Sequence, residues 1–561
     1  MGTKVNSNYE DLITYTRASK GHALRPVSYG DEEVTNGTYD TDSDWTLQRV
    51  SIAGGVADFS DNSLGPARVI QDDVYTVGKI YLVTFDVNES GTLRVYDGAG
   101  YDGDISVSSG TVSKIIYAEG TQFIIRANVT NDYTGTIDNV SVKEVLFDQP
   151  DGTLTLFEHP NNVPRVEYDA DGNRLGLLVE EQRTNLALNS NDLAADWSEQ
   201  ATTATLTQDV VGPDGKISAW TLVDDNSGGT ASTVGIQENL TFASGGTYAI
   251  SIFAKADGLN WIYFSNVLFD GGTDLNYFDL ENVALGASNP NTCFIEDVGN
   301  GWRRCTQVMT TTTDLSGIIV IKVANSDGDI TVDLDGTSSV QLYGFQIEAG
   351  SFPTSYIKNE GTSGGVTRSA DVASIPVADF GSNDSSYSML LEAISSAPDN
   401  GAGTGNNSNN IAQLITSPSN YSSLGISSTS TRVNRPSLAS RNNAATTVGA
   451  GSVASLDNTF DEGLLVKFCA SFDVDSGTIA GSVNGSTVFS STGSVAGVDV
   501  SFTDLEFNKG QGAAYIKSIK YYPRRLTNAQ LQALTEPRSD ATLSLTFDGL
   551  ESSFTENYIH G

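Results

Sequence analysis

The sequence is poor in cysteine. Three cysteines occur in 561 residues, at Cys293, Cys305 and Cys469, and an odd, sparse count excludes a disulfide framework. Cys293 and Cys305 flank a predicted turn at 299–301. We expect buried free thiols there rather than a disulfide, although the register of this hairpin is needed to settle the choice.

Long apolar runs and cations are also scarce. No stretch approaches the ~18 apolar residues of a membrane span, and the first 19 residues lack the apolar core of a cleaved signal. We therefore expect no membrane insertion, and synthesis in the cytoplasm without a signal peptide. The 31 Lys and Arg residues are outnumbered by 69 Asp and Glu, for a net charge of −38. Such a surface repels nucleic acid and anionic membranes, so no nucleic-acid partner is expected.

The residues that are abundant favour β-structure. Hydrophobic residues make up 39% and charged residues only 18%, and there are 56 glycines. Turn residues and β-branched strand formers fill the remainder, whereas helix surfaces would need more Glu, Lys and Ala. At a rough ~150 residues per domain the length predicts three or four domains. The predicted fold class is all-β.

Two regions share one pattern. The first, residues 36–147, begins with "NGTYDTDSDWTLQ", and the second, residues 186–350, contains "NSNDLAADWSEQ" near its start. Each has an Asn- and Asp-rich segment before a tryptophan, then a Gly-led alternating strand, then an alternating final strand. Many short strands separated by Gly, Asn and Asp turns indicate a β-sandwich used twice, of the jelly-roll type.

Alternation in "NWIYFSN" assigns side chains to faces. Ile262 and Phe264 share one face of the predicted strand, and Trp261 and Tyr263 share the other. Aromatic rings can stack on the apolar faces of sugars while polar side chains bind the hydroxyl groups. Trp261, Tyr263, Tyr277 and Trp302 are therefore the candidate carbohydrate-binding residues. The alternative for each is packing in the core or between domains.

The third region, residues 380–537, contains further strands and one predicted helix. Thr527 is a good N-cap, Gln530 completes a capping box, and Leu526 can pack on Leu531. The remaining predicted divisions are an N-terminal attachment segment 1–35, a junction 148–185, a linker 351–379 and a C-terminal tail 538–561.

Two phrases resemble virion proteins of tailed bacteriophages. "GLLVEEQRTNLALNS" (176–190) and "GSFPTSYIKNEGTSGGVTRSADVASI" (350–375) are similar to the phrases that lead into and out of a carbohydrate-binding-module-like jelly roll in those proteins. "ITYTRASKG" (13–21) resembles a phrase that normally stands shortly before the first of them, so the copy at 36–147 looks inserted. "FDVDSGTIAGSVNGSTVF" and "RLTNAQLQALT" are similar to the concanavalin A-like lectin or laminin-G fold.

This resemblance implies tandem jelly-roll β-sandwiches followed by a concanavalin A-like β-sandwich. It implies a fibre or spike in the virion, in the tail or as a head appendage. The implied partners are other virion proteins and host surface polysaccharide, and the implied state is a homo-oligomer, most simply a trimer. In this context the charged segment 180–183 becomes a junction. We expect its charges to pair with Arg165 or Arg368 where two domains meet.

Catalytic and metal motifs are weak. The nearest approach to a carboxylate pair is Glu167, Asp169 and Asp171 in "VEYDADG", where Asp171-Gly172 indicates a turn rather than a catalytic site. His22, His159 and His560 all lie outside the predicted sandwiches, which argues against a poised base. The phrase "DITVDLDGTSS" (329–339) offers Asp329, Asp333 and Asp335 to a structural Ca²⁺, with Asp333 and Asp335 on one strand face. The alternative is an exposed edge strand ending in a turn.

Two function classes follow. One is a glycan-reading adhesion protein that binds without cutting, and the other is a purely structural fibre or capsid decoration; a polysaccharide depolymerase is a weaker alternative. We predict no enzymatic activity and no obligatory cofactor. Because the chain carries a net charge of −38, acidic polysaccharides are expected to be poor ligands unless Ca²⁺ bridges them.

Overall fold

The computed structural model is all-β, which confirms the predicted fold class. The chain divides into two compact units, one formed by residues 25–160 and the other by residues 1–24 with 161–561. Within the described part no helix is long and apolar enough to cross a membrane. The structure describes residues 13–537 except for 62–64, 102, 130–131, 200–203, 230–231, 268, 270–272, 313–315, 382–384, 396–406, 418–419, 430–431, 443–445, 453–463, 474, 493–500 and 510–511.

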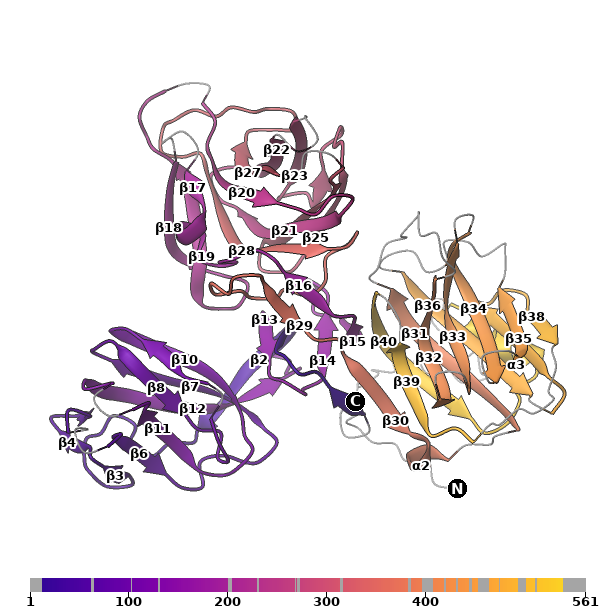
Figure 1. The fold of residues 1–561 in the computed structure, drawn as a ribbon, viewed down its shortest axis with the longest axis horizontal. Helices are drawn as coiled ribbons and strands as arrows, with labels where there is room; N and C mark the ends of the chain where they lie inside the picture. The colour runs from indigo at the N-terminus through magenta and orange to yellow at the C-terminus, as the bar shows by residue number, and fades with distance from the viewer. Residues whose placement is uncertain are drawn as a thin grey trace, which may run out of the picture. The chain divides into compact units, whose positions relative to one another are not determined.

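The unit 25–160 is a sandwich of two antiparallel sheets (Figure 1). One sheet has the order β10-β7-β12-β2-β13, with β5 also paired to β12 and β4 paired to β5. The other has the order β3-β6-β11-β8-β9. Their inner faces enclose a core that includes Phe85, Phe123 and Tyr133. The strands are β2 (Gly21–Glu32), β3 (Thr46–Gln48), β4 (Ser51–Ala53), β5 (Val56–Asp58), β6 (Arg68–Gln71), β7 (Ile80–Val87), β8 (Gly91–Val95), β9 (Ile105–Val107), β10 (Gly110–Tyr117), β11 (Phe123–Ala127), β12 (Thr136–Phe147) and β13 (Thr153–His159).

This unit extends beyond the span 36–147 that the sequence pattern indicated. β2 and β13 flank that span and add strands to its larger sheet. His22 lies in β2 and His159 in β13, and both are buried. The expectation that all histidines lie outside the sandwiches was therefore wrong for these two. The reason is that the sandwich includes β2 and β13, which lie outside the predicted span 36–147. His560 lies outside the described residues.

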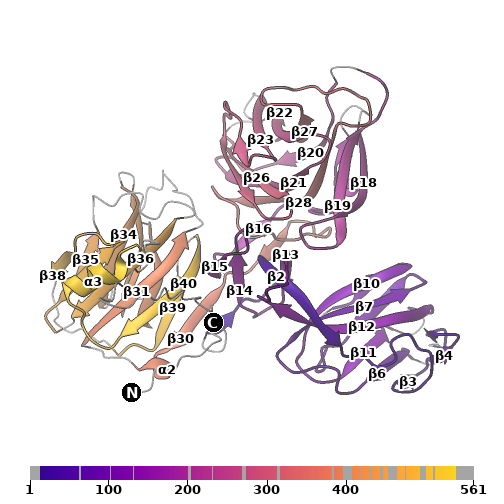
Figure 2. The ribbon, with the colours of Figure 1, turned by 180° about the vertical axis from the view of Figure 1, so that it is seen from behind.

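The second jelly roll packs two six-stranded sheets around the largest described core (Figure 2). The sheet orders are β17-β20-β27-β22-β23-β24 and β18-β19-β28-β21-β26-β25. Ile262 and Phe264 face this core, as the alternation predicted. The elements are α1 (Leu193–Asp196), β17 (Ser198–Glu199), β18 (Ala204–Val211), β19 (Ile217–Asp224), β20 (Gly235–Thr241), β21 (Thr247–Ala256), β22 (Trp261–Val267), β23 (Thr273–Asp279), β24 (Ala284–Leu285), β25 (Thr292–Asp297), β26 (Trp302–Thr310), β27 (Ser316–Ala324) and β28 (Ser339–Ala349).

The cysteines are free and buried, as expected. β25 and β26 do form a hairpin, but Cys293 lies opposite Gln307 and Cys305 lies opposite Ile295. The two thiols are therefore two positions out of register. Burial raises the pKa of Cys293 to about 12, which keeps this thiol protonated and unreactive at neutral pH.

The third sandwich has two seven-stranded sheets, ordered β1-β30-β39-β32-β33-β34-β35 and β14-β15-β40-β31-β36-β37-β38. A short ladder of β16 and β29 stands apart from both. The elements are β1 (Thr14–Thr16), β14 (Arg165–Tyr168), β15 (Arg174–Glu180), β16 (Arg183–Asn185), β29 (Val366–Arg368), β30 (Val372–Pro376), α2 (Val377–Phe380), β31 (Ser386–Ser395), β32 (Asn407–Ser417), β33 (Asn420–Thr429), β34 (Arg432–Asn442), β35 (Thr446–Ser452), β36 (Leu465–Asp473), β37 (Thr478–Val483), β38 (Phe489–Thr492), β39 (Asp504–Lys509), β40 (Ala513–Tyr522) and α3 (Asn528–Thr535).

This sandwich is assembled from distant parts of the sequence. β1, β14 and β15 belong to its sheets, and Tyr15, Leu177 and Val179 lie in its core. The chain thus starts this sandwich, leaves it for residues 25–160, returns for β14 and β15, and leaves again for the jelly roll. β16 and β29 pair antiparallel where the chain leaves and returns. The sequence pattern assigned β1 to an attachment segment and β14 and β15 to a junction. In the structure all three are strands of the third sandwich.

The predicted C-terminal helix is α3. Thr527 and Gln530 form the reciprocal capping box. Leu526 and Leu531 are buried in one apolar cluster, as the predicted staple requires. The tail 538–561 lies outside the described residues.

Candidate functional site

Three of the four predicted sugar-binding aromatics gather on one sheet face. Trp261 and Tyr263 on β22 and Tyr277 on β23 point away from the sandwich core and pack with Ala324 and Leu275. Tyr263 lies opposite Tyr277 in the ladder, and their rings stack at 4.9 Å with an interplanar angle of 24°. We call Trp261, Tyr263 and Tyr277 the outer aromatic group. Alternation placed Trp261 and Tyr263 on this face correctly because β22 is regular along its length.

The two tyrosines are covered, however. Tyr263 is 1% and Tyr277 is 5% exposed. The Tyr263 hydroxyl donates to the carbonyl of Ile330 at 3.2 Å, and the Lys322 ammonium lies 5.6 Å from the Tyr263 ring centroid. Burial raises the pKa of both phenols, so they stay neutral. In this conformation neither tyrosine ring presents a face to a ligand.

Trp261 is the member that remains accessible. Its side chain is partly exposed, and it packs against the buried tyrosines. Asn260 precedes it and Asn325 follows its ladder partner Ala324, and both asparagines are exposed. Their side-chain amides already donate within the protein, Asn260 to Glu281 and Asn325 to Asp329. The feature available to a ligand is therefore the partly exposed indole, whose face can stack on the apolar face of a sugar.

The fourth residue, Trp302, was wrongly assigned to a ligand face. It lies on β26 of the other sheet and is 1% exposed. Its ring packs against Tyr343 at 6.5 Å, and Tyr343 packs against Tyr356 at 5.6 Å. Alternation does put Trp302 on the outer face, opposite in parity to Cys305 of the core. That face is covered by another part of the chain.

The covering segment is 352–359, which we call the strap. Side chains of the sheet hold its backbone directly. Arg304 donates to the carbonyl of Thr354 at 2.6 Å, and Glu348 accepts from the amide of Thr354 at 2.8 Å. Gln346 accepts from the amide of Ile357 at 2.6 Å. Buried side chains that satisfy a backbone in this way fix it in place. The strap therefore excludes ligands from this part of the sheet β18-β19-β28-β21-β26-β25.

The predicted Ca²⁺ ligands are not assembled into a site. Asp333 and Asp335 are exposed in a loop rather than on a regular strand. Asp335 accepts from the amide and hydroxyl of Thr337, which holds a local turn. Nowhere among the described residues do three His, Cys, Asp or Glu side chains come together in a way that could hold a metal ion. Asp333 and Asp335 therefore do not form the predicted Ca²⁺ site in this structure.

Two carboxylates of "VEYDADG" accept hydrogen bonds from backbone amides. Glu167 accepts from the backbone amide of Leu24 at 2.8 Å. Asp169 accepts from the amides of Asp171 and Asn173, which closes the turn between β14 and β15. A carboxylate committed to its own turn is poorly placed for acid or base chemistry.

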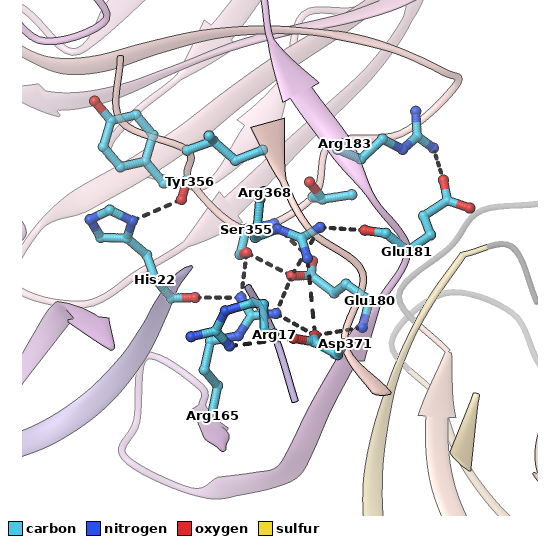
Figure 3. A network of polar contacts seen from close by, with 12 residues as sticks. Arg17, His22, Arg165, Glu180, Glu181, Arg183, Ser355, Tyr356, Arg368 and Asp371 are labelled. Atoms are coloured by element: carbon cyan, nitrogen blue, oxygen red, sulfur yellow. Dashed lines mark hydrogen bonds and ion pairs between the residues drawn. The ribbon is translucent and has the colours of Figure 1, made fainter. Parts of the chain in front are cut away.

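The most extensive buried polar cluster surrounds the charged segment 180–183 (Figure 3). Arg165 donates to Glu180 at 2.8 Å and to Asp371 at 2.6 Å. Arg368 lies 3.5 Å from Glu180. The side chains of these four residues are at most 3% exposed. The predicted pairing of this segment with Arg165 and Arg368 is confirmed, with Glu180 as its buried member.

The strap and the segment after β1 also contact this buried cluster. Ser355 of the strap donates its amide and hydroxyl to Glu180, at 2.8 and 2.6 Å. Arg17, just after β1, is 3.3 Å from Asp371 and donates to the Tyr15 hydroxyl at 2.6 Å. We call Arg17, Arg165, Glu180, Arg368 and Asp371 the junction network. It joins the start of the third sandwich, the two β14–β15 strands, the strap and the return after the jelly roll.

The neighbouring pair is more exposed. Glu181 lies 2.5 Å from Arg183, with the two side chains 18% and 11% exposed. Glu181 also accepts from the amide of Gly512 at 2.7 Å, beside β40. Arg183 stacks over Phe352 at 4.7 Å. Through Arg183 this pair attaches β16 to the strap. Because both side chains are partly exposed, solvent and salt screen this ion pair more than they screen the pairs of Glu180.

No family model matches this chain. No curated protein matches it either. Among solved structures, the tandem CBM22-1–CBM22-2 domain of Paenibacillus barcinonensis Xyn10C aligns with 57% of this chain and 98% of its own, at 14% identity and a TM-score of 0.20. The ANXUR2 extracellular domain from Arabidopsis thaliana aligns with 62% of this chain and 93% of its own, at 10% identity and 0.19.

A third structure, the GH43 protein BlXynB from Bacillus licheniformis, aligns with 91% of this chain and all of its own, at 11% identity and a TM-score of 0.18. TM-scores this low describe a common use of β-structure and support no inference on function. The function of this chain has to be argued from its own residues.

Sequence reasoning missed Arg17, Ser355 and Asp371. Each lies in one of the quoted phrases, "YTRAS", "SFPTSY" and "TRSAD". Two of these phrases share a Thr-Arg pair, Thr16-Arg17 and Thr367-Arg368. This repeated pair was the available signal, and the structure shows that the phrases meet at one buried network.

The junction network predicts a specific loss of stability in acid. Burial by itself would raise the pKa of Glu180, but Arg368, Arg165 and the bonds from Ser355 lower it to about 2 from an ordinary 4.5. A carboxylate with a depressed folded pKa stabilises the fold fully above its unfolded pKa. That contribution is lost as the pH falls from 4.5 to about 2. The loss amounts to about 3 kcal/mol.

The measurement compares the unfolding free energy of the native protein with that of Glu180→Gln between pH 6 and pH ~2.5. The difference between the two proteins should shrink steadily below the unfolded pKa. Because the other carboxylates titrate in both proteins, the comparison isolates Glu180. A difference that stays constant over this range would show that Glu180 has an ordinary pKa.

Proposed function

We propose that this protein is a non-catalytic fibre or spike protein of a tailed-bacteriophage virion and that it binds host surface glycan through Trp261. The observation that carries the glycan proposal is the placement of Trp261, partly exposed on the outer face of a sheet and supported by buried Tyr263 and Tyr277. An apolar ring on a rigid support keeps its orientation, which lowers the entropic cost of stacking. The phrases at 176–190 and 350–375 support the virion assignment.

The covered outer face of the other sheet restricts where on this jelly roll a ligand can bind. Since the strap lies over the sheet that carries Trp302, the sheet β17-β20-β27-β22-β23-β24 is the face of this jelly roll left for a ligand. A single tryptophan gives weak affinity. We propose that the virion presents the protein as a homo-oligomer, a trimer in the simplest case, so that several weak sites act together.

Trp261→Ala should weaken binding to the host glycan by about 1–3 kcal/mol per site, if stacking on this ring resembles that of bases on aromatic side chains. The fold should be retained, because the ring is partly exposed and its neighbours stay packed. Titration of purified protein against host surface polysaccharide measures the affinity, and release of reducing ends from the same polysaccharide tests for cleavage.

Tyr117→Ala is a matched control, since Tyr117 is an exposed aromatic (38%) on the unit 25–160. It should bind like the native protein. If Trp261→Ala folds and binds normally while the native protein binds host cells, the ligand contacts another surface. If the native protein binds no host glycan, the competing function, a purely structural fibre or decoration, replaces this one. The burial of Tyr263, Tyr277 and Trp302 is the observation that favours that alternative.

A further inference from the structure

Three arginines stand in one row across a sheet of the unit 25–160. Arg68 on β6 lies directly opposite Arg126 on β11, and Arg126 lies directly opposite Arg94 on β8. Their strand neighbours Val69, Ile125 and Leu93 face the core. The alternation of a strand therefore places all three arginines on the outer face. We call Arg68, Arg126 and Arg94 the arginine row; β6, β11 and β8 are seen side by side in Figure 1.

Folding alone does not account for this row. Side chains directly opposite in adjacent strands lie close together, and like charges there destabilise a sheet. The chain has only 31 Lys and Arg residues and a net charge of −38. Scarce cations could have been separated at no cost to the strands. Their alignment at neighbouring positions indicates a use for concentrated positive charge.

Two of the arginines are oriented by neutral groups. Arg68 donates from Nε to the amide oxygen of Gln48 at 2.8 Å, and Arg126 donates from Nη1 to the Tyr96 hydroxyl at 2.8 Å. Within the described part of the chain, no carboxylate forms an ion pair with either. Arg94 differs, because it donates to Asp104 at 2.6 Å. The guanidinium groups of Arg68 and Arg126 thus keep uncompensated charge on a partly exposed face.

Aromatic rings extend the row at its Arg94 end. The Arg94 guanidinium lies 4.2 Å from the Tyr101 ring centroid, and Tyr101 is 42% exposed. Tyr96 and Tyr101 pack with their centroids 5.4 Å apart. A planar guanidinium binds a carboxylate with two parallel hydrogen bonds, and a tyrosine ring can stack on a sugar. The row and the tyrosine pair together offer both kinds of contact within one sheet face.

We propose that this face binds a glycan that carries carboxylate groups, such as a chain of uronic acids. The inference goes beyond the function proposed for Trp261, since it concerns a different module and a charged ligand. It also revises the expectation that acidic polysaccharides are poor ligands. That expectation used the net charge of the whole chain, whereas contact recognition depends on the local charges. Double-stranded nucleic acid carries a phosphate every ~1.7 Å of its axis, so the long-range repulsion of the acidic surface disfavours it more than a uronate chain with at most one charge per sugar.

The test measures binding of the full-length protein to polygalacturonate, alginate and hyaluronate at low salt, beside carboxyl-reduced forms of the same polymers. We expect binding of at least one uronate polymer and about tenfold or weaker affinity for its reduced form, as the loss of one or two charge-assisted hydrogen bonds predicts. Arg68→Gln with Arg126→Gln should reduce uronate binding by about tenfold or more.

The matched control is Lys79→Gln with Lys143→Gln. It removes the same charge, from residues on or next to β7 and β12 of the opposite sheet, and should leave affinity within about twofold because distant exposed charges are screened. Thermal unfolding of both double variants checks the fold. Trp261→Ala should still bind uronate, which separates this proposal from the first.

Several results would overturn it. One is the absence of binding to all three uronate polymers, and another is equal binding to the carboxyl-reduced forms. A third is native affinity in a folded Arg68→Gln, Arg126→Gln variant. Tighter binding of double-stranded DNA than of any uronate polymer would mean that the row recognises phosphate instead.

Discussion

Glu180→Gln should lower the unfolding free energy of the third sandwich by about 3–5 kcal/mol, the usual cost of breaking a buried ion pair on one side. Glu180 is 3% exposed and accepts from Arg165 at 2.8 Å and from Ser355 at 2.6 Å. Glutamine keeps the shape of the side chain but not its charge. Arg165, Arg368 and Arg17 would then share Asp371 as the one carboxylate of the junction network.

Differential scanning calorimetry can locate the effect, because the chain has separate compact units. The transition of the third sandwich should move down by roughly 10 °C, and that of the unit 25–160 should not move. Glu181→Gln is the control. Its carboxylate is 18% exposed and pairs with Arg183, so it should cost about 1 kcal/mol or less.

A double-mutant cycle with Arg368→Gln tests whether the charges act together. Removing Arg368 as well takes away part of the excess positive charge, so the double variant should lose less than the sum of the two single losses. Strictly additive losses, or a Glu180→Gln transition at the native temperature, would contradict the proposed role of the junction network.

The charged segment 180–183 shows which contacts could be predicted from the sequence and which could not. The resemblance of 176–190 and 350–375 to phrases that flank a jelly roll implied a junction, with Arg165 or Arg368 as an expected partner, and Glu180 contacts both. Asp371 and Arg17 could not be predicted in the same way. They are separated by 354 residues in the sequence, and only the pairing of β1 with β30 brings them together. Two modules lie between these strands in the sequence, so no local pattern indicates that the strands pair.

Alternation assigned side chains to the correct face of a sheet, but it did not predict which of them are exposed to solvent. Alternation placed Ile262 and Phe264 in the core and Trp261 and Tyr263 outside it. It could not show that residues 352–359 cover the face of Trp302, because alternation within one strand contains no information on a distant segment. The arginine row could not be predicted from the sequence for a similar reason. Each arginine is visible in its own strand, but their alignment depends on the register of three strands.

The burial of Trp302 leads to the second large effect. Trp302→Ala should destabilise the jelly roll by about 3–5 kcal/mol, as expected for truncation of a fully buried aromatic side chain. The ring is 1% exposed and packs against Tyr343, which in turn supports Tyr356 of the strap. Its removal leaves a cavity between the sheet and the strap. Trp302→Phe should cost less, because a smaller ring fills part of that space.

Trp261→Ala and Trp302→Ala should therefore give opposite patterns. The first should lower glycan affinity and leave thermal unfolding almost unchanged. The second should lower the unfolding temperature of the jelly roll and, measured well below that temperature, leave glycan affinity unchanged. The physical reason is that Trp261 has exposed ring surface but Trp302 does not. A Trp302→Ala protein that unfolds at the native temperature yet loses glycan binding would show that Trp302 contacts the ligand. The strap would then have to leave the sheet when glycan binds, and the Arg304 and Glu348 contacts to Thr354 would be the ones that open.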